Sequence, residues 1–160
     1  MSRFVTFGEI MMRLNPEGYD RFVQADRFEA SYAGGEANVA VSVAEQLVKR
    51  FGCKRVAVTL RTSLSAFDSL WAGMLYDAKA KKACFSKEYA LHIVDRVGGG
   101  DSFGGGLIYA LATGKKPQAA IDFAVAASAL KHSIEHDFNL VSVAEVESLA
   151  SGNGTGRVQR

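Results

Sequence analysis

The sequence lacks the features that define several large classes of protein. It contains two cysteines and two prolines, and no apolar run is long enough to cross a membrane. Cys53 and Cys84 form neither a CxxC pair nor a metal-spaced cluster, so we expect free thiols rather than a disulfide framework. The first residues reach Glu9 before an apolar segment can develop, which predicts no secretory signal. We therefore expect a cytoplasmic protein that makes no contact with membranes.

The sequence also lacks a large excess of either positive or negative charge. The 160 residues carry a net charge of +2, with 22% charged and 48% hydrophobic residues, as in an ordinary globular domain. The one dense basic run, Lys79, Lys81 and Lys82, has no interleaved aromatic residues. It favours a solvated turn over a nucleic-acid-binding surface, so no nucleic-acid partner is expected.

Hydrophobic periodicity predicts strands alternating with helices, the pattern of a layered α/β fold. A turn is expected at residues 15–18, and Ser142 with Glu145 has the spacing of a capping box at the start of the last helix. The helix after the glycine-rich stretch is apolar enough to be buried on most sides. We expect strands over residues 4–14, 28–32, 55–60, 71–76 and 90–94, helices over 38–51, 101–113, 117–131 and 142–150, and a flexible tail over 151–160.

The densest chemical signal is the glycine-rich segment that ends in Gly98, Gly99, Gly100 and Asp101. A strand ends before these glycines and an apolar helix follows them. Glycines let backbone N–H groups converge, and a helix start adds unpaired donors and partial positive charge, so an anion is favoured there. Asp101 lies in the same turn, where its charged form is stabilised. The segment therefore predicts an anion site beside a proton acceptor.

Other interpretations of the glycines were weighed. A Walker A motif fails because Tyr109 stands where its first glycine is needed, and the dinucleotide fingerprint fails at Phe103. This second failure disfavours a nicotinamide-dependent dehydrogenase. A purely structural turn, with Asp101 as a helix cap, stays open. His132 and His136 are four residues apart, but a third metal ligand is not evident, which disfavours a metal site.

A second glycine motif, Ala33-Gly34-Gly35-Glu36-Ala37-Asn38, is weak alone. Together with GGGDSFGGG it resembles the signatures of the ribokinase-like (pfkB) carbohydrate kinases, most closely those that act on 2-keto-3-deoxygluconate. Further agreement lies in residues 7–14, 59–61 and 137–141. The resemblance implies a three-layer α/β/α fold and an ATP-dependent sugar kinase, with fructokinase or a related sugar kinase as the alternative.

The resemblance also implies roles for individual residues. Asp101 would be the catalytic base, and Gly98, Gly99 and Gly100 the anion hole for the transferred phosphoryl group. Gly34, Asn38 and Asp137 would contact the sugar or sugar-acid substrate. Thr59, Arg61 and Ser63 fall where the family's nucleotide-contacting turn begins, although surface turn residues are the simpler interpretation of Arg61 and Ser63. ATP and Mg²⁺ are the implied cofactors.

The sequence departs from the family in length. Residues 1–43 resemble its N-terminal block and residues 44–150 its C-terminal block, so the lid and several strands of the sheet are expected to be absent from a single domain over 1–150. An N-x-x-E magnesium motif does not occur in the sequence. Uncovered sheet edges would favour a homo-oligomer. A silent remnant that only binds nucleotide or self-associates is the alternative of a different class.

Overall fold

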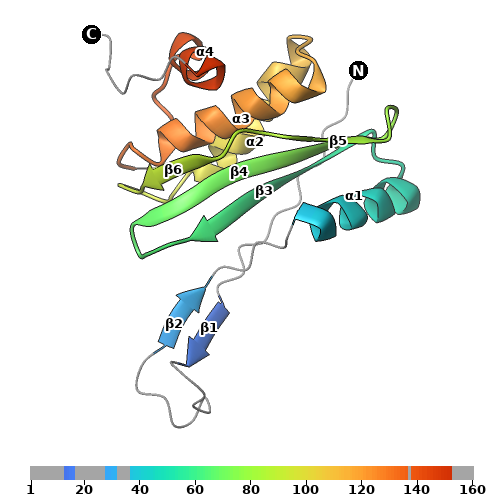
Figure 1. The fold of residues 1–160 in the computed structure, drawn as a ribbon. Helices are drawn as coiled ribbons and strands as arrows, with labels where there is room; N and C mark the ends of the chain where they lie inside the picture. The colour runs from blue at the N-terminus through green and yellow to red at the C-terminus, as the bar shows by residue number, and fades with distance from the viewer. Residues whose placement is uncertain (1–12, 17–27, 32–36, 137, 153–160) are drawn as a thin grey trace.

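The protein is built from an antiparallel sheet with helices on both faces (Figure 1). A computed structural model describes residues 13–16, 28–31, 37–136 and 138–152, with side chains from residue 41 onward. The elements are β1 (Arg13–Pro16), β2 (Phe28–Ser31), α1 (Ala37–Phe51), β3 (Arg55–Ser63), β4 (Asp68–Asp77), β5 (Lys82–Phe85), β6 (Tyr89–His92), α2 (Gly99–Ala112), α3 (Pro117–Lys131) and α4 (Val143–Ser151).

Strand β4 is the centre of the larger sheet. Strand β3 pairs with it along one edge, from Arg55 opposite Asp77 to Ser63 opposite Ser69. On the other edge, β5 pairs with the second half of β4 and β6 with the first half, all antiparallel. Strands β1 and β2 form a separate antiparallel pair.

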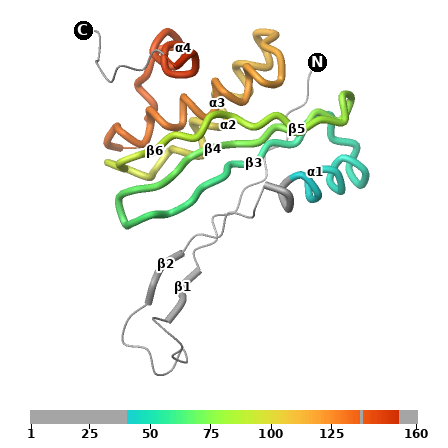
Figure 2. Tube along the Cα trace, viewed as in Figure 1, coloured from blue at the N-terminus to red at the C-terminus, as the bar shows by residue number. Residues whose placement is uncertain are grey.

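The helices lie in two layers. Helix α1 packs on one face of the sheet against β3 and β4, while α3 covers the opposite face and carries α2 and α4 (Figures 1 and 2). No helix in the described ranges is long and apolar enough to span a membrane. The three layers match the expected α/β/α arrangement.

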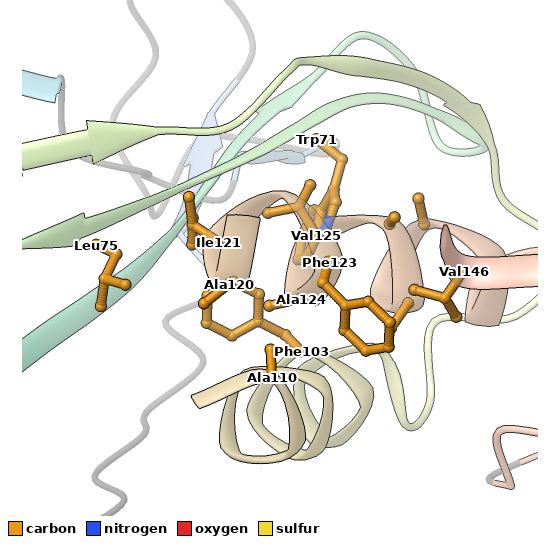
Figure 3. Close-up of a cluster of buried hydrophobic side chains, with 13 residues drawn as sticks. Trp71, Leu75, Phe103, Ala110, Ala120, Ile121, Phe123, Ala124, Val125 and Val146 are labelled. Atoms are coloured by element: carbon orange, nitrogen blue, oxygen red, sulfur yellow. The ribbon is translucent and has the colours of Figure 1, made fainter. Parts of the chain in front are cut away.

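The main core lies between β4, α2 and α3 (Figure 3). Trp71 and Leu75 of β4 meet the buried face of α3, where Ile121 and Val125 are fully covered. Two glycines permit the close packing. A Cβ on Gly73 would lie 2.8 Å from Cγ2 of Val125, and a Cβ on Gly106 would lie 3.1 Å from the Ala127 Cβ. Short residues at these contacts therefore set how closely the layers approach.

Most elements match the sequence prediction, including α3 over its predicted range and the Ser142–Glu145 capping box of α4. Several expectations were wrong. The backbone over 13–16 is a strand where a turn was expected at 15–18, and β5 was not predicted. Helix α4 includes Ser151, which was assigned to the tail. Helix α2 is not buried on most sides, because Gly105 and Tyr109 are exposed.

Candidate active site

The glycine-rich turn joins the end of β6 to the start of α2. Gly98 is the N-cap of the helix, with φ of 77° and ψ of −4°. This left-handed conformation is costly for residues with a Cβ and easy for glycine. Gly98 therefore turns the chain sharply enough for α2 to begin at the next residue.

The first amides of α2 are only partly used inside the protein. The Gly99 N–H donates to the Arg96 carbonyl at a long 3.4 Å, and the Ser102 N–H donates to the Gly98 carbonyl at 2.8 Å. Between them, the amides of Gly100 and Asp101 have no acceptor among the described residues. Gly100 and Asp101 are also exposed. Two backbone donors at the positive end of a helix are thus available to an anion.

Asp101 is the third residue of α2 and lies beside these donors. Its carboxylate makes no hydrogen bond or ion pair within the described part of the chain. Helix capping does not account for it, because Gly98 is the N-cap and no side chain caps the helix. The cap interpretation of Asp101 is therefore wrong, and its carboxylate is accessible to a proton donor outside the protein.

A cavity of about 400 Å³ opens beside Asp101 and Ser102. The exposed face of α2, a part of α3 and the start of α4 line it, together with the segment that joins α3 to α4. Tyr109 and Phe123 stack in its wall, with ring centroids 5.4 Å apart. The cavity therefore combines a carboxylate in the first turn of a helix with an apolar, aromatic wall.

The other side of the turn is held by the end of α3. The Ser128 hydroxyl donates to the Gly99 carbonyl at 2.7 Å, and both groups are buried. The His132 carbonyl accepts from the amides of Val94 and Asp95, which precede the turn. Sequence reasoning did not find Ser128 and considered His132 only as a metal ligand, because these contacts depend on how α3 packs.

Asp95 stabilises the start of the turn. Its carboxylate accepts hydrogen bonds from the amides of Val97 and His136, both at 2.9 Å. The Val97 amide is the main cause that lowers the pKa of Asp95 below its ordinary value, although partial burial opposes it. The charged form of Asp95 therefore connects the glycine turn to the segment after α3.

Comparison with known proteins decides the family. Residues 70–134 match the pfkB family of carbohydrate kinases. The crystal structure of 2-dehydro-3-deoxygluconokinase from Thermotoga maritima is 43% identical over 73% of this chain, with a TM-score of 0.70. The chain belongs to the pfkB family.

Two other solved structures agree with this assignment. A pfkB family carbohydrate kinase from Listeria grayi is 31% identical over 67% of this chain, with a TM-score of 0.64. A candidate 2-keto-3-deoxygluconate kinase from Enterococcus faecalis, 23% identical over 80% of this chain with a TM-score of 0.66, supports the fold. The chain spans about a third of these structures, namely 35%, 33% and 36% of their lengths. No curated protein matched in the sequence search. The fold is thus a partial ribokinase-like fold, as predicted.

The nucleotide contacts expected from the pfkB resemblance lie on β3. Thr59, Arg61 and Ser63 stand at alternate positions of this strand, so the turn expected to begin there starts only after Ser63. They are not surface turn residues. Arg61 lies directly opposite Trp71 in the register of β3 and β4, so the two side chains are on the same face of the sheet. Trp71 packs on His132, and the charge of Arg61 lowers the pKa of His132, so this is the face that α3 covers. Their role in nucleotide binding stays a prediction.

The predicted sugar contacts of this pfkB protein cannot be placed. Gly34 and Asp137 lie outside the described residues, and the same holds for the side chain of Asn38, whose backbone is in α1. Among the described residues, no three His, Cys, Asp or Glu side chains gather as a metal site. If ATP binds here, the available amides would contact its phosphate groups, and Mg²⁺ would be held mainly by those phosphates.

Proposed function

We propose that this chain carries the phosphoryl-transfer part of an ATP-dependent sugar kinase whose substrate is 2-keto-3-deoxygluconate, phosphorylated at its terminal hydroxyl. The observation that carries the proposal is the exposed carboxylate of Asp101 beside two amides that lack acceptors in the described structure. The sugar acid is chosen because the Thermotoga maritima structure is a 2-dehydro-3-deoxygluconokinase. The cytoplasmic location and the homo-oligomer stay predictions from the sequence.

The reaction would need little covalent participation by the protein. Asp101 would accept the proton of the sugar hydroxyl while its oxygen forms a bond to the γ-phosphorus and the bond from that phosphorus to the β,γ-bridging oxygen breaks. The amides of Gly100 and Asp101, which follow Gly98 and Gly99 at the start of α2, would hold the transferred group, whose charge is spread over its equatorial oxygens. Mg²⁺ bound with ATP supplies further charge neutralisation. The cavity beside Asp101 has room for a bound substrate.

The test is an ATP-coupled assay of the full chain with 2-keto-3-deoxygluconate and with fructose, in parallel with Asp101→Asn. We expect turnover with the sugar acid and its loss in the variant, because the amide cannot accept the proton. Asp122→Asn is the matched control. The Asp122 carboxylate accepts from the Gln118 amide on α3, and the control should keep the wild-type rate.

Each other outcome has a defined meaning. Preference for fructose would select the alternative sugar kinase. Nucleotide binding without turnover of either sugar would select the silent remnant. Near-normal turnover by Asp101→Asn would remove Asp101 from the role of base and refute the proposed site.

A further inference from the structure

The ring of His132 lies against the glycine turn and is almost completely buried, with 3% of the residue exposed. We propose that His132 is a positioning residue for this turn, which keeps the Gly99 backbone in place so that the next two amides remain directed to the ligand. The inference rests on the proposed function, because it assigns a role within the same site.

The imidazole of His132 limits the space at position 99. A Cβ built on Gly99 would lie 2.6 Å from Cε1 and 2.9 Å from Nε2 of His132, closer than real Cβ atoms approach other atoms. Gly99 does not have the positive φ of Gly98, so its backbone conformation alone would accept a side chain. The imidazole is therefore the reason that position 99 needs glycine, and the ring forms the surface on which the turn is seated.

The ring of His132 is itself fixed from two sides. Nδ1 of His132 lies 2.7 Å from the Ser128 carbonyl, which can only accept, so Nδ1 carries the proton. The ring also packs on Trp71, with centroids 4.8 Å apart. The ring is held by α3 on one side and by β4 on the other, so it cannot move away from Gly99 without breaking these contacts.

The same end of α3 holds both ends of the turn. The His132 carbonyl accepts from the Val94 amide at 2.8 Å and from the Asp95 amide at 3.3 Å, before the turn. The Ser128 hydroxyl donates to the Gly99 carbonyl after it. The imidazole therefore completes a set of contacts that fixes the turn from entry to exit.

The neutral form of the ring is favoured, which is consistent with a role in packing rather than in charge stabilisation. Burial lowers the pKa of His132, the hydrogen bond to Ser128 opposes this, and the fields of Arg61, Lys131 and Arg96 lower the pKa further. These are the charged groups that act on the ring from β3, the end of α3 and the turn. The imidazole is neutral at pH 7, so the phosphoryl charge is left to the backbone amides.

Kinetics of the full chain test the inference. We expect His132→Ala to lower kcat roughly 100-fold, the loss typical of a displacement of about 1 Å at a reacting centre, with little change in KM for ATP. His132→Asn should recover most of kcat, because its amide N–H can replace the Nδ1 donor. His92→Asn, an exposed histidine on β6, is the matched control and should keep wild-type values.

A complementation experiment separates positioning from general loss of structure. Gly99→Ala should lower kcat because its Cβ collides with the ring, and adding His132→Ala should restore part of that loss by opening space. A double variant no more active than Gly99→Ala would overturn the inference. Wild-type kcat in His132→Ala, with Asp101→Asn inactive, would overturn it while leaving the proposed function intact.

A binding measurement decides the matter for a chain without turnover. In ¹⁵N–¹H spectra of the full chain titrated with inorganic phosphate, the Gly100 and Asp101 amide signals should shift in the wild type and in Asp101→Asn. In His132→Ala these shifts should be lost while the rest of the spectrum stays dispersed. Equal phosphate shifts in wild type and His132→Ala would refute the positioning role, and the absence of shifts in the wild type would refute the anion site itself.

Discussion

Gly73→Ala is the substitution that most directly tests how closely the helices pack on the sheet. The added Cβ would lie 2.8 Å from Val125 Cγ2, 3.1 Å from Ile121 Cδ1 and 3.1 Å from Phe103 Cε2. Val125 is fully buried and, as a β-branched residue in a helix, has essentially one rotamer, so it cannot turn aside. The helix α3 must therefore move away from β4.

The magnitude follows from two opposing effects. Overpacking a filled core costs about 1–3 kcal/mol. Alanine loses less conformational entropy on folding than glycine does, so the replacement inside a strand by itself adds roughly 0.5–1 kcal/mol to the free energy of unfolding. The difference between these ranges runs from about 0 to 2.5 kcal/mol. Because the closest contact, 2.8 Å, is with a side chain that cannot change rotamer, we expect a net loss of about 1–2.5 kcal/mol in the free energy of unfolding. This loss lowers Tm by roughly 2–10 °C in a protein of this size.

Urea and thermal unfolding followed by circular dichroism measure this loss. The control is the same substitution at Gly104, which lies in α2 with nothing within 4 Å of a built Cβ. Gly104→Ala should raise stability by about 0.5–1 kcal/mol, because alanine is the better helix former. If Gly73→Ala were as stable as the wild type, or if the two variants changed stability in the same direction, the packing argument would be wrong.

Three further predictions concern caps and titration. Ser142→Ala should lower the free energy of unfolding by about 1 kcal/mol in urea titrations, because it removes the capping box with Glu145. Asp95→Ala should cost about 0.5–1.5 kcal/mol in the same titrations, because the exposed Val97 and His136 amides exchange a carboxylate acceptor for water. Because folding lowers the pKa of His132 below 6.5, the unfolded chain binds a proton at a higher pH than the folded protein does. The contribution of His132 to stability is therefore complete above about pH 6.5 and is lost as pH falls from there through the lower pKa of the folded protein. Tm should therefore fall as pH is lowered below about 6.5 in the wild type, and His132→Asn should flatten that decline.

The sequence predicted those elements whose signals are local. Helix α3 has Pro117 in its first turn, and α4 has its own capping box, so both were found close to their true limits. Strand β5 was missed because its four residues, Lys82 to Phe85, show no distinct alternation and are specified by pairing with β4. Strand β3 was predicted too short for the same reason, since its last residues are held by Leu70 and Ser69.

The candidate site divides in the same way. The turn at Gly98–Gly100 and the carboxylate of Asp101 are contiguous in sequence, so their chemistry could be predicted. Ser128 and His132, which support the turn, lie at the end of α3. Ser128 is 29 residues from Gly99 in the sequence, and only the packing of α3 brings the two together. A histidine and a serine four residues apart on a buried helix face were the available signal.

Trp71 gives this protein an optical reporter. It is the one tryptophan among the 160 residues, and its indole packs on the imidazole that contacts Gly99. Anything that displaces the backbone at Gly99 must move the imidazole and so alter the surroundings of the indole. Excitation at the red edge of the indole band would therefore report events at the glycine turn in the unlabelled chain, without a second tryptophan to obscure the change.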